Sequence, residues 1–170
     1  DGDLDSLALV DALDGNSRLH VGRIIGRSGS LTMARVALPI LTKYNQAYWG
    51  IEVNSGWGQN AVDAVRAAYP RPRIYRRPQD GNETPEHYRI HADSGFLTTE
   101  ASKNRIIQGL IDDYNTGRFK TFFPETNHMF MNFDPKSPAH TQDEMISLAI
   151  ANEVAKDQRV WQQGVPNGGS

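Results

Sequence analysis

The chain contains no cysteine. This absence excludes a disulfide framework and zinc sites built from thiolates, and it fits a reducing compartment. No apolar run approaches the roughly 18 residues that would indicate a membrane helix. The chain also lacks a large excess of charge of either sign, because its formal net charge is only −2. Any contact with nucleic acid must therefore come from a local basic patch and not from the overall charge.

Several common catalytic motifs are missing as well. The sequence has no G-x-x-x-x-G-K-[ST] phosphate loop, which excludes ATP hydrolysis by that route. It has neither a G-x-S-x-G nucleophile elbow nor an H-E-x-x-H metal-binding helix. Its chemistry must therefore rest on other groups.

What is present describes an ordinary globular domain. The 170 residues are 38% hydrophobic and 22% charged, which is typical of a chain that buries a core. We predict one domain over residues 1–160 and a flexible tail over residues 161–170. The chain does not begin with methionine, and residues 1–5 resemble the end of a loop. We therefore expect that an N-terminal part, including the first strand of the domain, is missing.

The order of predicted elements is that of an α/β protein. The apolar run at 7–13, the turn sequence at 14–17 and the alternating run at 18–26 predict a β-hairpin. Further strands are expected at 48–53, 73–76 and 118–122, and helices at 30–44, 59–68, 99–115, 125–133 and 141–156. A hairpin followed by βα units fits an RNase H-like mixed sheet flanked by helices. That fold class places acids at strand ends and on one late helix around a pair of metal ions.

Glu52 is the first candidate metal ligand. It stands at the end of the apolar strand predicted over 48–53, and we expect the chain to turn sharply on Gly56 and Gly58 after it. A carboxylate in such a strand is costly to desolvate unless a cation meets it. That cation could be a metal ion, or an arginine paired with a purely structural glutamate.

Asp143 is the second candidate. Thr141 and Glu144 match a capping box, which gives Glu144 a structural role at the start of a helix. Asp143 precedes Ile146 and Ile150 on the face expected to pack inward, and the helix dipole stabilises an acid there. It either binds a metal or merely occupies the helix start. Two acids from distant elements suggest a divalent metal site and phosphodiester chemistry.

Other acids and histidines are weaker candidates. Asp1, Asp3 and Asp5 crowd the entrance of the hairpin, either as metal ligands or as a flexible acidic loop. His140 stands just before the Asp143 helix and could reach a metal or a bound phosphate. His128 is expected to be partly buried in the core, because apolar residues surround it.

Basic residues gather between positions 71 and 77. Arg71, Arg73, Arg76 and Arg77 lie within seven residues, and Lys103 follows on a later helix. On a chain of slightly negative charge this cluster suits a strip that binds DNA phosphates. A solvated charged face is the alternative.

Taken together, these motifs resemble the C-terminal nuclease domain of the large terminase subunits of tailed bacteriophages. Each motif is weak alone, but the ordered set spans nearly the whole chain. The matching segments are Asp5-Ser6-Leu7-Ala8-Leu9-Val10, Gly50-Ile51-Glu52-Val53-Asn54, Ile74-Tyr75-Arg76, Gly95-Phe96-Leu97-Thr98-Thr99-Glu100-Ala101-Ser102-Lys103 and Gln142-Asp143-Glu144.

The resemblance implies an RNase H-like endonuclease that cuts double-stranded concatemeric viral DNA during genome packaging, with two Mg²⁺ or Mn²⁺ ions. Glu52 matches the second acid of the family, Asp143 the last, and Asp5 a secondary acidic position. The implied partners are double-stranded DNA, a portal protein and a small terminase subunit, with no membrane. The implied location is the cytoplasm of the host bacterium, for a phage or prophage protein that is not secreted.

Two departures from the family pattern leave other readings open. Gln142 stands where the family usually carries the first of two adjacent aspartates, and the first catalytic acid of the family would lie upstream of Asp1. One alternative is another RNase H-like nuclease, such as a resolvase or transposase core, which would prefer branched DNA. The other is a catalytically inactive DNA-binding or assembly module of the same fold, which Gln142 favours.

Overall fold

The computed structural model of the chain describes residues 5–12, 16–53, 55–76, 94–134 and 143–156, with the side chains of 55–59 excepted. The chain forms two compact units. Unit 1 combines Asp1–Arg27 with Ser102–Ser170, and unit 2 is Ser28–Ala101. The single domain expected over residues 1–160 stays a prediction, and the tail expected at 161–170 lies outside the described residues.

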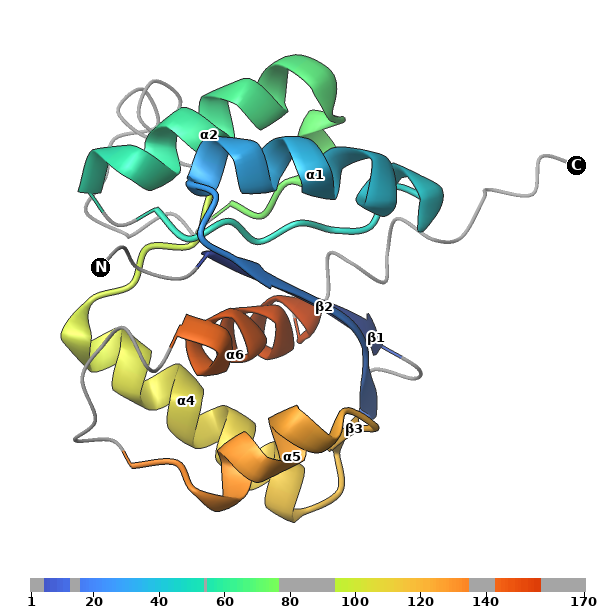
Figure 1. Ribbon diagram of the computed structural model, residues 1–170, viewed down its shortest axis with the longest axis vertical. Coiled ribbons are helices and arrows are strands. Elements are labelled where there is room, and N and C mark those ends of the chain that lie inside the picture. The colour runs from blue at the N-terminus through green and yellow to red at the C-terminus, as the bar shows by residue number, and fades with distance from the viewer. Residues whose placement is uncertain (1–4, 13–15, 54, 77–93, 135–142, 157–170) are drawn as a thin grey trace, which may run out of the picture. The chain divides into compact units, whose positions relative to one another are not determined.

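Unit 1 is built on a small mixed sheet (Figure 1). Strands β1 (Asp5–Ala12) and β2 (Arg18–Gly26) form the predicted antiparallel hairpin, with a register irregularity between Leu9 and Val10. Strand β3 (Phe119–Thr121) pairs with β2 in parallel, which gives the order β1-β2-β3. The hairpin, the strand near 118–122 and the α/β class are thus confirmed.

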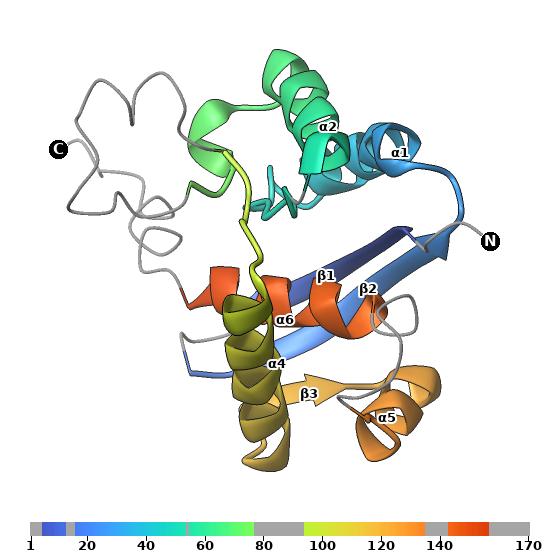
Figure 2. The same cartoon turned by 90° about the vertical axis from the view of Figure 1, so that its left-hand side faces the viewer.

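Three helices complete the described part of unit 1. Their bounds agree with the predicted helices to within a few residues; they are α4 (Glu100–Asn115), α5 (Pro124–Met131) and α6 (Asp143–Ala155). Helix α6 packs along β1 and β2, as Figures 1 and 2 both show. The inward face predicted for α6 is confirmed, because Ile146, Ile150 and Val154 are all buried. Hydrophobic burial of this face is the main force that holds α6 on the sheet.

Unit 2 contains two helices that pack on each other, α1 (Ser30–Lys43) and α2 (Ser55–Ala68), and a short 3₁₀ helix, η1 (Arg71–Arg73). Helix α1 continues through Pro39. The remaining backbone pairing consists of isolated bridges: Trp49 pairs with Ile74 and Glu52 with Phe96 in parallel, and Arg76 pairs with Ser94 in antiparallel. Unit 2 therefore holds its extended segments together by a few backbone hydrogen bonds.

Three predictions for unit 2 were wrong. The segments 48–53 and 73–76 are bridged only at isolated positions and do not form regular strands. Pro70 and Pro72 precede the second segment. Because the fixed φ of proline suits a helical turn, residues 71–73 form η1 and Arg73 is not part of a strand. Helix α2 begins at Ser55, four residues earlier than the predicted start at 59, so Gly56 and Gly58 lie in the helix and not in a turn.

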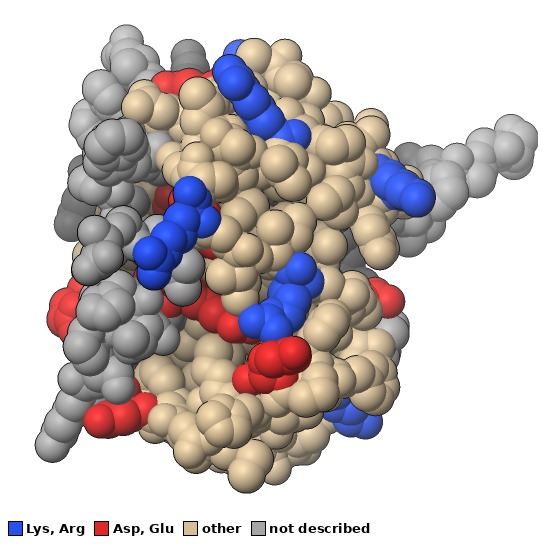
Figure 3. Space-filling view, in the orientation of Figure 1, with Lys and Arg blue, Asp and Glu red and all other residues tan. Residues whose placement is uncertain are grey.

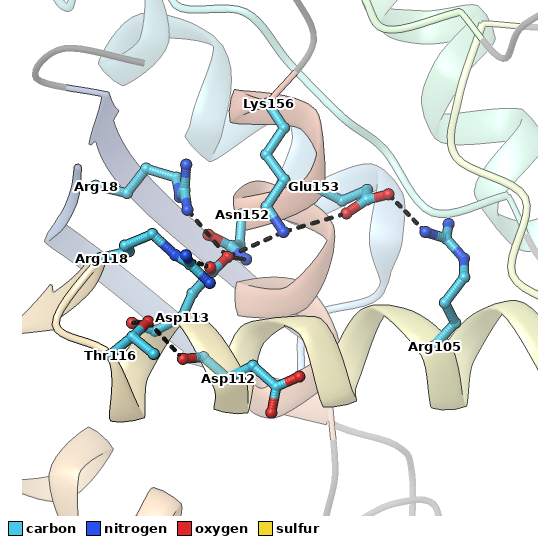
Figure 4. Close-up of polar contacts among 9 residues, drawn as sticks. All are labelled: Arg18, Arg105, Asp112, Asp113, Thr116, Arg118, Asn152, Glu153 and Lys156. Atoms are coloured by element: carbon cyan, nitrogen blue, oxygen red, sulfur yellow. Dashed lines mark hydrogen bonds and ion pairs between the residues drawn. The ribbon is translucent and has the colours of Figure 1, made fainter. Parts of the chain in front are cut away.

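A buried carboxylate ties the elements of unit 1 together (Figure 4). The Asp113 side chain of α4 accepts hydrogen bonds from Arg118 Nε at 2.8 Å and from Arg18 Nη2, Asn152 Nδ2 and Lys156 Nζ, each at 2.9 Å. Asp113 and Arg18 are each only 4% exposed. One carboxylate thus joins the start of β2, helix α4, the residue before β3 and the end of α6.

The surroundings of Asp113 keep it ionised. Burial by itself raises the pKa of this carboxyl group. The hydrogen bonds from Asn152, Lys156 and Arg118 and the charge of Lys156 outweigh that effect and lower the pKa to about 2. The ion pair with Arg18 is consequently present throughout the neutral pH range.

Replacing Asp113 with asparagine should destabilise the protein strongly. The Asp113→Asn variant leaves the buried Arg18 guanidinium without its counter-charge, which typically costs about 3–5 kcal/mol of the free energy of unfolding. Urea unfolding followed by circular dichroism measures this loss. The matched control is Asp112→Asn, because Asp112 is the exposed neighbour on the same helix and should change stability by less than about 0.5 kcal/mol. Equal effects of the two changes would contradict the assignment.

Candidate functional site

Asp5 begins β1, and Asp143 begins α6, the helix that packs along β1. Figures 1 and 2 show β1 and α6 starting at the same end of unit 1. Ser6 follows Asp5 directly, and Ser147 lies about one helical turn after Asp143. The hydroxyl groups of these two serines are hydrogen-bonded at 2.8 Å. The structure thus brings the first residue of β1 and the first turn of α6 into one neighbourhood.

The two acids approach that neighbourhood from different sides of the sheet. Ser6 points toward α6, so the alternation of side chains along a strand directs Asp5 to the opposite face. Asp143 is half-buried at the start of the helix that covers the first face. A group bound by both acids would therefore lie beyond the end of the sheet, where oxygen atoms from either face can reach it.

Glu144 makes two side-chain contacts that its sequence position does not predict. Its carboxylate accepts a hydrogen bond from Arg23 Nη2 at 3.0 Å and another from the hydroxyl of the fully buried Thr126 at 3.1 Å. Its expected capping partner, Thr141, lies outside the described residues. Glu144 thus links α6 to β2 and α5.

Glu52 belongs to unit 2. It is half-buried and bridged to Phe96, and its carboxylate accepts a hydrogen bond from the hydroxyl of Thr98. Gly95 makes this arrangement possible: its φ is +118°, and a β-carbon there would lie 2.4 Å from the Val53 side chain. The local sequence around Thr98 does not reveal that its hydroxyl contacts Glu52.

The basic residues remain candidates for DNA contacts. Arg76 is exposed and Arg73 is half-buried in unit 2, while Lys103 is half-buried on α4 and belongs to unit 1. Figure 3 shows several described Lys and Arg side chains exposed on one face. The phosphate-binding strip stays a prediction, and Arg77 lies outside the described residues.

The remaining candidates are Asp3, His140 and His128. Asp3 and His140 lie outside the described residues. The prediction that His128 is partly buried was wrong, because its side chain is exposed. Helix α5 turns Thr126 into the interior instead, and His128, two residues further, projects about 200° away around the helix.

His20 is a buried histidine whose importance the sequence did not reveal. It is only 1% exposed, and its Nε2 donates to the Gly22 carbonyl at 2.9 Å while Nδ1 lies 3.1 Å from the Thr121 hydroxyl. Burial lowers the pKa of His20 most strongly, and the positive charge of Arg23 lowers it further. The hydrogen bond to Gly22 raises the pKa, and the net result is a value of about 4. The ring is neutral at pH 7 and joins β2 to β3.

Acidification should therefore destabilise the protein through His20. Below pH 6.5 the unfolded chain binds a proton that the folded chain excludes until the pH reaches about 4. The free energy of unfolding should thus fall by up to about 1.4 kcal/mol per pH unit across that window. Urea unfolding at several pH values measures the slope. His20→Gln should flatten it, whereas His128→Gln, which changes an exposed ring, should leave it intact.

Within the residues that the structure describes, no three His, Cys, Asp or Glu side chains are grouped so that they could hold a metal ion. None of the helices that the structure describes is long and apolar enough to cross a membrane. No protein-family model matches the chain, and a search of curated proteins found no match either.

Proposed function

We propose that this chain is an RNase H-like nuclease domain of a terminase large subunit, which uses Mg²⁺ or Mn²⁺ to cut double-stranded viral DNA during genome packaging. One observation carries the proposal: α6 begins at Asp143 at the same end of unit 1 where β1 begins at Asp5. The mixed sheet and the helix packed on it are consistent with the fold that the sequence resembles.

The donor chemistry at this end of unit 1 fits a hard divalent cation. Mg²⁺ keeps several of its waters and is commonly bound through one or two carboxylates together with substrate phosphates. Asp5 and Asp143 can supply two such carboxylates. When bound, the metal activates a water and stabilises the charge on the leaving oxygen of the phosphodiester.

The residues of the chain have separate roles in this proposal. Asp143 presents its carboxylate from the positive end of the α6 dipole, where a negative charge is favoured. Glu52, oriented by Thr98, presents a carboxylate from unit 2. The resemblance alone assigns Glu52 to the same metal centre, and it alone names a portal protein and a small terminase subunit as partners.

A second candidate function is an inactive DNA-binding or assembly module of the same fold. Gln142 favours this reading, because an amide replaces one of the acids that the resemblance leads one to expect. An amide oxygen can coordinate a cation but brings no charge, so the affinity of the site for metal would be reduced. The two functions differ in whether metal-dependent cleavage occurs.

The nuclease proposal predicts Mn²⁺-dependent cleavage of plasmid DNA that stops on addition of a chelator. Asp143→Asn and Glu52→Gln should each lower the rate at least about 100-fold, or ~2.7 kcal/mol in activation free energy. Asp112→Asn changes an exposed acid away from the site and should cleave normally. Gel assays of nicked and linear products, with circular dichroism of each variant, measure these effects.

Three outcomes would contradict the proposal. Unchanged cleavage by Asp143→Asn would remove that acid from the site. Metal-independent DNA binding without cleavage would favour the inactive module. A preference for four-way junctions over linear duplex would instead favour a resolvase.

DNA binding should depend on Arg76. If its exposed guanidinium contacts a phosphate, Arg76→Ala should weaken duplex binding and reduce the slope of log K against log salt by about 0.9. Fluorescence anisotropy at several salt concentrations, with Ca²⁺ in place of Mn²⁺, measures both quantities. Arg66→Ala is the control in unit 2, because Arg66 already pairs with Asp63 at 4.0 Å on α2. Equal slopes for the two variants would remove Arg76 from the DNA contact.

A further inference from the structure

Glu144 follows Asp143 directly, but both of its oxygens already have protein partners. Oε2 accepts from Arg23 Nη2 at 3.0 Å, and Oε1 accepts from Thr126 Oγ1 at 3.1 Å. The Glu144 side chain is 18% exposed, and Thr126 is completely buried. The carboxylate is thus an anchor for the first turn of α6 within the protein.

Arg23 adds a second ion pair to this anchor. Its Nη1 lies 3.2 Å from Glu125 Oε2 on α5, so one guanidinium bridges acids from two helices while its own backbone lies in β2. The planar fork of arginine suits such a two-sided contact. Its positive charge also offsets that of Glu144, which reduces the repulsion between Glu144 and the neighbouring Asp143.

Ser147, three residues after Glu144, adds a further tie to this part of the helix. Its hydroxyl donates to the Glu144 carbonyl at 3.1 Å and is hydrogen-bonded to the Ser6 hydroxyl of β1 at 2.8 Å. The first turn of a helix is prone to fray, because its N–H groups have no partners within the helix. Here β1, β2 and α5 all hold that turn in place.

We propose that Arg23 and Thr126, acting through Glu144, are positioning residues that hold Asp143 in the orientation needed to bind the divalent metal ion. This inference rests on the proposed function. Metal ligands must be held within about 0.5 Å of their productive geometry. Partners that orient ligands without touching the metal typically change its affinity 10- to 100-fold when removed.

The test is the Mn²⁺ affinity of the whole chain, measured by titration calorimetry. Thr126→Val removes the hydroxyl while keeping the branched shape, and it should weaken Mn²⁺ binding about 10-fold. Thr126→Ser restores the hydroxyl and should recover the affinity. Arg23→Met should also weaken binding. The control is Arg105→Met, which breaks a 2.8 Å ion pair with Glu153 in the other half of α6 and should leave Mn²⁺ binding unchanged.

Thermal unfolding of the same variants separates positioning from plain structural support. If Thr126→Val lowers the melting temperature but binds Mn²⁺ like the wild type, the positioning role is overturned. If this variant does not fold, Glu144→Gln replaces it, because glutamine still accepts from Thr126 but loses the charge that Arg23 meets. The same comparison of Mn²⁺ affinities then decides the question.

An Asp143→Asn arm distinguishes this inference from the proposed function. Loss of Mn²⁺ binding in Asp143→Asn, together with wild-type affinity in Thr126→Val and Arg23→Met, overturns only the positioning role. Equal Mn²⁺ affinity in Asp143→Asn and the wild type overturns the metal site itself. A wild-type chain that binds no Mn²⁺ overturns both.

Discussion

The Asp113 carboxylate is the point on which the rest of unit 1 depends. It is buried, it is ionised, and its four hydrogen bonds come from three cations and an amide located at the start of β2, before β3 and at the end of α6. None of these elements can shift without exposing a charge to an apolar interior, which is strongly unfavourable. At the opposite end of α6, the contacts of Glu144 with Arg23 and Thr126 hold the helix start against β2 and α5. Polar contacts therefore hold both ends of the helix in place, and apolar side chains pack between them.

The sequence predicted correctly those helices and strands whose local turn residues and apolar spacing are enough to specify them. The turn chemistry at 14–17 and the alternation at 18–26 predicted the hairpin, and the apolar spacing predicted α1, α4 and α6. Periodicity failed around Glu52 because the segment 48–53 makes single bridges to two separate segments of unit 2. Such pairing depends on distant partners, and a local apolar run does not reveal whether they form a regular ladder.

The candidate acids could be selected from the sequence, but the groups that surround them could not. An acid in an apolar segment or at a helix start stands out locally, which is why Glu52 and Asp143 could be selected. Their supporting groups are remote in sequence: Arg23 reaches Glu144 across 121 positions, and Thr98 reaches Glu52 across 46. His20 was missed for a similar reason: its structural role is a contact between β2 and Thr121 of β3, and no spacing rule predicts that contact.

Adjacent acids at the start of α6 show how environment divides roles between chemically similar groups. Glu144 has both oxygens bonded to protein donors and its charge offset by Arg23. Asp143 lies one residue earlier, at the first position of the helix, where the dipole favours an anion. Since residue 142 is a glutamine and both oxygens of Glu144 bond to the protein, the proposed metal site draws on Asp143 from this turn. In that proposed site, the precision with which Arg23 and Thr126 hold the turn would matter more than in a site with two adjacent aspartates, because a single ligand has no neighbour to compensate for its displacement.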